Sequence, residues 1–211
     1  MSPNSWNNTT QYLDTSTVLD TDEDSSDNDD TDKNFGQLSS LTYTASAART
    51  KTNLQSFANK TRASDPEGAA KMEQLFASTD IIGAIGGAMD GVGLNHSNAA
   101  DAFALYWVSA WKAANGDSSS AAARTYQAVA QQAARGLSSS PEFARATDAQ
   151  KQEMAEAMMI QAALIDAYVE EYASDPAMLR KVSQAVMQGA KASGLELDKM
   201  TLTEGGFVKA K

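Results

Sequence analysis

The distribution of alanine divides this chain of 211 residues into two parts. No alanine occurs from Met1 to Thr44, whereas 38 occur from Ala45 onward. Alanine is the strongest helix former. Asn, Thr, Ser and Asp, which make up most of the first part, compete with the helix for backbone hydrogen bonds. The sequence therefore predicts a helical domain at 41–208, preceded by a non-helical segment at 1–40.

Helix start and stop signals recur along the second part of the chain. Apolar residues are spaced three or four positions apart, as on the inner face of an amphipathic helix. Asp65-Pro66 and Asp175-Pro176 each place an N-cap residue before a proline at the first helical position. The predicted fold class is all-α, a bundle of six or seven helices. The other expected starts are Thr79 or Asp80, Ser97 or Asn98, Ser119 and Thr147, and the expected ends include Asn115-Gly116, Gly136, Ala173 and Gly194.

The predicted helix at 98–115 is apolar around most of its circumference, which is typical of a helix at the centre of a bundle. Two tryptophans lie one turn apart on one face of it, and we expect both to be largely buried. The predicted structural core comprises Phe103, Trp107, Trp111, Leu164 and Ile165.

Only two short stretches, 40–44 and 199–203, alternate polar and apolar residues as a β-strand does. This alternation is a weak signal in stretches so short. A small two-stranded pairing between the two stretches is compatible with the pattern and would leave the all-α class unchanged.

Most of the net charge lies in the first 33 residues. They hold nine acids and one base, which accounts for −8 of the formal charge of −10. The segment has few apolar residues to offset the entropy of ordering. We therefore predict an extended acidic arm at 1–40 that is disordered in isolation. The residues suited to anchor this arm to a partner protein are Trp6, Tyr12, Leu13, Val18 and Leu19.

The absence of cysteine and the presence of a single histidine narrow the possible chemistry. Disulfides, thiolate catalysis and cysteine-ligated metals are excluded, and so are sites that need several histidines. We expect no cofactor and no metal. The acidic balance argues against a nucleic-acid partner, which would require a basic patch. No apolar run approaches the roughly 20 residues that span a bilayer, and the polar start of the chain does not resemble a signal peptide.

The acidic run Asp20–Asp24 resembles the start of a calcium-binding loop, in which carboxylates alternate. The pattern then fails, because Ser25 stands where the sharp turn needs glycine and Thr31 stands where a bidentate glutamate belongs. Calcium is therefore not an expected partner of this segment.

Gly83, Gly87 and Gly91 recur every four residues and share one helical face. This spacing lets a second helix approach closely. We interpret it as tight packing inside the bundle, with a membrane-active segment as the alternative.

His96 lies in the loop before the tryptophan-containing helix, where Ser97 and Asp101 are close to it in sequence. A histidine acting as a general base needs an acid or a nucleophile within reach. Both neighbours are also suited to a helix start, so the pattern alone does not predict catalysis.

Five acids lie on the predicted long helix, and a ferritin-like metal site would also require histidines at Glu-x-x-His spacing. No such histidine exists, so we interpret these acids as a solvated face. They are Glu153, Glu156, Asp166, Glu170 and Glu171.

Two stretches carry a family resemblance, 94–116 with its AW-x-AANG pattern and 195–208 with its LTE-x-GFV pattern. Together with Asp65-Pro66 and Leu75-Phe76-Ala77, they resemble an uncharacterised bacterial all-helical family, a domain of unknown function. The resemblance covers about 45–208. It implies no activity, ligand or catalytic residue, but its members are mostly exported, which favours a periplasmic or extracellular location. The polar start of the chain, which lacks the pattern of a signal peptide, keeps the cytoplasm as the alternative.

These observations favour a non-enzymatic helical interaction or structural module that binds a partner protein or itself, with its acidic arm as a candidate contact. Two alternatives remain. The first is a hydrolase-like enzyme that uses His96, which a cleft with an acid in hydrogen-bond reach would favour. The second is a membrane-active effector that acts through the glycine-rich helix.

Overall fold

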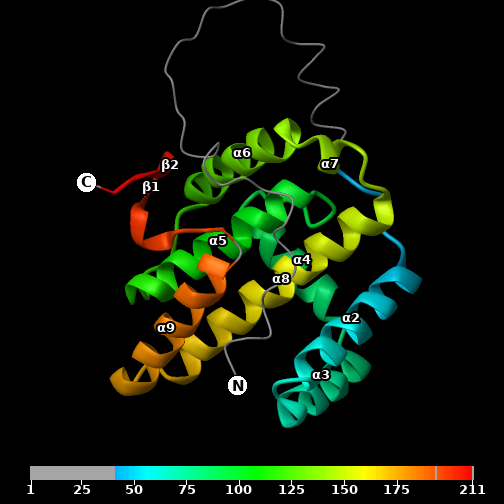
Figure 1. Cartoon of the computed structure of the whole chain (residues 1–211), viewed down its shortest axis with the longest axis horizontal. Coiled ribbons are helices and arrows are strands. Elements are labelled where there is room, and N and C mark those ends of the chain that lie inside the picture. The colour runs from blue at the N-terminus through cyan, green and yellow to red at the C-terminus, as the bar shows by residue number, and fades with distance from the viewer. Residues whose placement is uncertain (1–40, 193, 211) are drawn as a thin grey trace, which may run out of the picture.

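The computed structural model describes residues 41–192 and 194–210, and helices dominate this part of the chain (Figure 1). Eight α-helices lie in the described residues; seven have 11 residues or more, and the eighth is a single turn, which confirms the all-α fold. The helices are α2 (Ala47–Arg62), α3 (Pro66–Ser78), α4 (Ile81–Gly91), α5 (Ala99–Asn115), α6 (Ala123–Ser139), α7 (Pro141–Ala144), α8 (Asp148–Glu171) and α9 (Pro176–Ala192). The predicted arm at 1–40 lies outside the described residues.

Several helix starts follow the local signals of the sequence, but the expected start at Ser119 is wrong, because α6 begins at Ala123 without a side-chain cap. The side chain of Asp65 accepts a hydrogen bond from the Gly68 N–H, and that of Asp80 accepts one from the Gly83 N–H. Thr147 forms a capping box with Gln150 at the start of α8. These contacts satisfy backbone donors that a helix start leaves free.

The predicted end of α6 at Gly136 is wrong, because the helix continues to Ser139. Gly136 is buried, and Leu137 on the added turn is fully buried. Burial of a leucine side chain contributes about 1.5–3 kcal/mol. It therefore outweighs the cost of about 1 kcal/mol for glycine inside a helix.

Helix α5 is the centre of the bundle, with α6, α8 and α9 packed around it (Figure 1). Phe103 and Trp107 are buried and meet edge to face at 5.8 Å. Ile165 of α8 is also buried, as predicted. Trp111 and Leu164 are only partly buried, contrary to prediction. The Trp111 indole N–H donates to the Met200 carbonyl at 2.9 Å, so its ring lies where the core meets a polar backbone.

The described strands, β1 (Met200–Thr203) and β2 (Gly206–Lys209), form a small antiparallel hairpin. The predicted pairing of 199–203 with 40–44 is wrong, since β1 pairs with β2 and Thr42 forms a bridge to Asn98 instead. Closing a tight hairpin costs less chain entropy than joining distant segments. Gly206, at a φ of +99°, permits the turn.

The side-chain amide of Gln132 fixes the hairpin to α6. Its Nε2 donates to the Phe207 carbonyl and its Oε1 accepts from the Phe207 N–H, both at 2.8 Å. The Phe207 ring then meets Trp107 edge to face at 6.4 Å. The hairpin thus closes one side of the core of α5.

The interpretation of the glycine face of α4 as a packing surface is wrong. Gly83, Gly87 and Gly91 are exposed, and a methyl group at Gly87 or Gly91 would meet no atom within 4 Å among the described residues. The buried face of α4 instead carries Ile82, Ile85, Gly86 and Met89. Burial of the Ile82, Ile85 and Met89 side chains orients the helix and turns Gly83, Gly87 and Gly91 outward.

Candidate functional site

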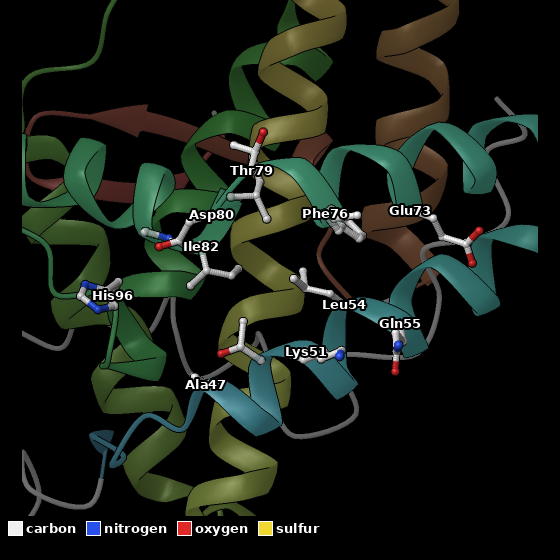
Figure 2. A pocket seen from close by; sticks show the side chains of 14 residues that line it. Ala47, Lys51, Leu54, Gln55, Glu73, Phe76, Thr79, Asp80, Ile82 and His96 are labelled. Atoms are coloured by element: carbon white, nitrogen blue, oxygen red, sulfur yellow. The ribbon is translucent and has the colours of Figure 1, made fainter.

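A groove with a volume of about 910 Å³ lies between α2 and the junction of α3 with α4. We call it the α2–α4 groove, and the residues that define it here are Lys51, Leu54, Phe76, Asp80, Ile82 and His96. Figure 2 shows Leu54, Phe76 and Ile82 towards its centre, His96 at one end, and Gln55 with Glu73 at the other. The sequence placed several of these residues on helix faces but did not predict that they line a cavity.

The two carboxylates that line the groove already have partners. Glu73 pairs with Arg62 of α2, and Asp80 accepts the Gly83 N–H at 3.0 Å. Lys51 is exposed and forms no ion pair within the described residues. The groove therefore offers a free ammonium group beside an apolar centre.

His96 closes one end of the groove. Its Nδ1 is buried and has no hydrogen-bond partner among the described residues. A methyl group at Gly86 would lie only 3.0 Å from this nitrogen, so the ring packs directly against the backbone of α4. The hydrolase-like hypothesis required an acid in hydrogen-bond reach of the imidazole, and Nδ1 has none in the described part of the chain.

The two sequence neighbours of His96 have other contacts. The Asp101 carboxylate accepts the Asn95 N–H at 2.7 Å; burial raises the pKa of Asp101, and this hydrogen bond partly offsets the rise. The Ser97 carbonyl accepts the Tyr43 N–H at 3.1 Å. Both residues therefore hold the loop in place.

Tyr43 ties the start of the described chain to the histidine loop. Its hydroxyl donates to the His96 carbonyl at 2.7 Å. Burial, with the carboxylate of Glu156 nearby, raises the pKa of Tyr43 well above its usual value, so the hydroxyl stays a neutral donor. The chain thus enters the domain beside the His96 end of the groove.

A buried polar network joins α2 to α8 beside the groove. One oxygen of Glu156 accepts from Thr50 Oγ1 at 2.6 Å and from Gln152 Nε2 at 2.9 Å, and the other accepts from Asn53 Nδ2 at 2.6 Å. The Arg49 Nε donates to Gln152 Oε1 at 2.7 Å. Thr50 also lines the groove, so the network fixes one of its walls.

The interpretation of the acids of α8 as a solvated face is therefore wrong for Glu156, which is only 2% exposed. Its donors Thr50 and Asn53 lie more than 100 residues earlier in the chain. The other four acids, Glu153, Asp166, Glu170 and Glu171, are exposed as predicted. The Asp166 carboxylate also accepts a hydrogen bond from Ser109 Oγ at 3.0 Å.

The predictions about metal binding, membrane spanning and the acidic arm are tested only in part by the described residues. Within 41–192 and 194–210, no group of three or more His, Asp or Glu side chains could hold a metal ion. No helix in these ranges combines the length and the apolar character needed to cross a bilayer. The arm residues Trp6, Tyr12, Leu13, Val18 and Leu19, and the acidic run that resembles a calcium loop, lie outside the described residues.

Residues 3–209 match one protein family, described as Family of unknown function (DUF6683). This match confirms the resemblance to a domain of unknown function. It begins at residue 3, so the family sequence also includes the acidic segment that the resemblance at 45–208 left out. No curated protein and no solved structure matches the chain.

Proposed function

Since the chain belongs to this family of unknown function, we propose its function from the groove itself. The protein is a non-enzymatic helical interaction module, and the α2–α4 groove binds a segment of a partner polypeptide in which large apolar side chains lie beside carboxylates. The observation that carries this proposal is Lys51, a cation without an ion pair in the described residues, at the edge of an apolar cavity.

The apolar centre of the groove supports side-chain binding. A volume of about 910 Å³ falls within the range of ligand pockets, roughly 300–1,000 Å³. Leu54, Phe76 and Ile82 provide the apolar surface (Figure 2). Transfer of a leucine- or phenylalanine-sized side chain into such a site would contribute about 1.5–3 kcal/mol.

The charge of helix α2 favours an acidic segment. Its 16 residues include four bases and no acid. Lys60 pairs with Glu153 at 3.6 Å, and Arg62 pairs with Glu73. The Arg49 guanidinium donates hydrogen bonds to Gln152 Oε1 and to the Thr44 carbonyl. Lys51 is thus the base of α2 best placed to meet a carboxylate of a partner in the groove.

The two alternative functions have less support. His96 lies in the groove, but its buried Nδ1 has no hydrogen-bonded acid among the described residues, so nothing there activates it as a base. The exposed residues of α4 are glycines, alanines and Asp90. They therefore offer none of the large apolar side chains that insert into a lipid interface.

Synthetic peptides and a charge reversal test the proposal. The probes are short peptides with an apolar pair followed by aspartate, the same peptides with lysine in place of aspartate, and a third set with serine in place of the apolar pair. We expect the full chain to bind the aspartate peptides about threefold to fivefold more tightly than the lysine peptides in fluorescence anisotropy. The serine peptides should bind weakly.

Lys51→Glu should reverse this preference, because the groove then presents a carboxylate. Lys181→Glu is the matched control, an exposed lysine on α9, which does not line the groove. It should keep the preference of the wild-type chain. Equal binding of the aspartate and lysine peptides by the wild type would refute the proposed function, and so would an unchanged preference in Lys51→Glu.

A further inference from the structure

We propose that residues 12–20 of this chain are themselves an occupant of the α2–α4 groove, so that the chain's own acidic segment competes with a partner for it. This inference rests on the proposed function of the groove and adds its regulation. Four observations carry it: the place where the chain enters the domain, the pattern of residues 12–20, the reach of the connecting residues, and the charge of α2.

The chain enters the described domain beside the groove. The Tyr43 hydroxyl donates to the His96 carbonyl at 2.7 Å, and the Tyr43 N–H donates to the Ser97 carbonyl at 3.1 Å. Leu41, the first described residue, is 1% exposed and so is firmly anchored. His96 closes one end of the groove (Figure 2). Residues before Leu41 therefore start from that end.

The segment has the residue pattern that the groove favours. Tyr12-Leu13 is followed directly by Asp14, and Val18-Leu19 is followed directly by Asp20. Each triplet places two large apolar side chains beside a carboxylate. An apolar pair fits the centre of the groove, and the carboxylate is suited to Lys51 at its edge.

The chain between Asp20 and Leu41 is long enough to reach every part of the groove. Its residues span about 70 Å when fully extended. A covalent tether of this length keeps the segment near the groove at an effective concentration on the order of millimolar. Even a weak affinity of residues 12–20 for the groove would therefore populate the docked state within one chain.

The charges of the two partners are complementary. Residues 1–33 carry a net charge of −8, whereas α2 carries four bases and no acid. Three of these bases already have partners within the described residues, so Lys51 is the cation that the groove offers to this segment. The family match extends from residue 3 through the domain, so this segment and the groove belong to one family sequence.

The absence of cysteine makes a direct test possible in the full chain. Gln55→Cys places a nitroxide spin label on an exposed residue that lines the groove and leaves Lys51 intact. We expect NMR signals of residues 12–20 to broaden strongly, and those of residues 25–35 to broaden less. Lys181→Cys, labelled in the same way on α9, should leave residues 12–20 sharp. Equal broadening from both labels, or none from Gln55→Cys, would overturn the inference.

A mixed sample separates docking within a chain from docking onto a second copy. Isotope-labelled chain without a spin label is mixed with unlabelled chain that carries the label at Gln55→Cys. Sharp signals for residues 12–20 support docking within one chain. Broadening in this sample would show docking between copies and overturn the proposal.

Peptide binding distinguishes failure of this inference from failure of the proposed function. In the double variant Leu13→Ser, Leu19→Ser, the groove should bind the aspartate peptides about tenfold more tightly, because self-occupancy is removed. Unchanged affinity overturns the inference and leaves the proposed function standing. No binding of the peptides by this variant refutes the proposed function, on which the inference rests.

Discussion

Two regions of the molecule are held together by different forces. Around α5, large apolar side chains pack into one continuous core that includes Phe103 and Trp107. The α2–α3 hairpin contributes Leu54 to that core, but its other buried apolar side chains, Ala58, Ala69 and Met72, lie outside it. Its contact with α8 centres on the polar network of Glu156 and Gln152. In Figure 1 this hairpin lies at one edge of the bundle.

This difference explains why the groove lies where it does. Apolar packing is dense and leaves few voids, as in the core around α5. A polar contact fixes α2 at specific hydrogen bonds without filling all the space beside it. Leu54 and Ile82 line the two sides of the gap although each is only 9% exposed, and the partly buried Phe76 lines it beside them.

The largest expected effect tests the apolar region. Trp107→Ala should lower the free energy of unfolding by about 3–5 kcal/mol, because the ring is 1% exposed and leaves a large cavity. Denaturant titration measures the change. Met72→Ala in the α2–α3 hairpin is the comparison variant and should cost less, since fewer core atoms surround it. An equal loss in both variants would break the distinction between the two regions.

Local signals in the sequence predicted much of the fold. Asp65, Asp80 and Thr147 begin helices as expected, because an N-cap bonds to backbone groups two or three residues away. The central position of the helix with Trp107 also followed from its nearly uniform apolar surface. These features depend on neighbouring residues, so a single sequence contains the information they need.

The features that the sequence missed depend on distant contacts. Glu156 reads as a solvated acid unless its donors Thr50 and Asn53 are known to face it. The groove could not be predicted from the sequence either, because its walls come from helices that are separate along the chain. One signal was available in the sequence: the segment 47–62 has four bases and no acid, although the chain as a whole is acidic. This excess of basic over acidic residues favours α2 as a helix that contacts negatively charged groups.

The second prediction tests the polar region. Glu156→Ala leaves the donors of Thr50, Asn53 and Gln152 without their acceptor and should cost about 1–3 kcal/mol. We expect hydrogen exchange to speed up in α2 before it does in α5. Glu153→Ala, on the same helix, removes only an exposed ion pair and should cost at most about 1 kcal/mol. Equal acceleration in α2 and α5 would show that the two regions open as one unit.

The smallest expected effect distinguishes two adjacent glycines of α4 and tests how the His96 end of the groove is held. Gly87→Ala should stabilise the protein by about 0.5–1 kcal/mol, because its methyl group meets open space and alanine favours the helix. Gly86→Ala should instead destabilise it, since the methyl group would lie 3.0 Å from Nδ1 of His96. Denaturant midpoints measure both changes, and the imidazole NMR signals should shift only in Gly86→Ala. If Gly86→Ala is as favourable as Gly87→Ala, the ring moves freely away from α4. The groove would then be closed at that end by the loop alone, and its shape would depend on the Tyr43 contact rather than on the apolar core.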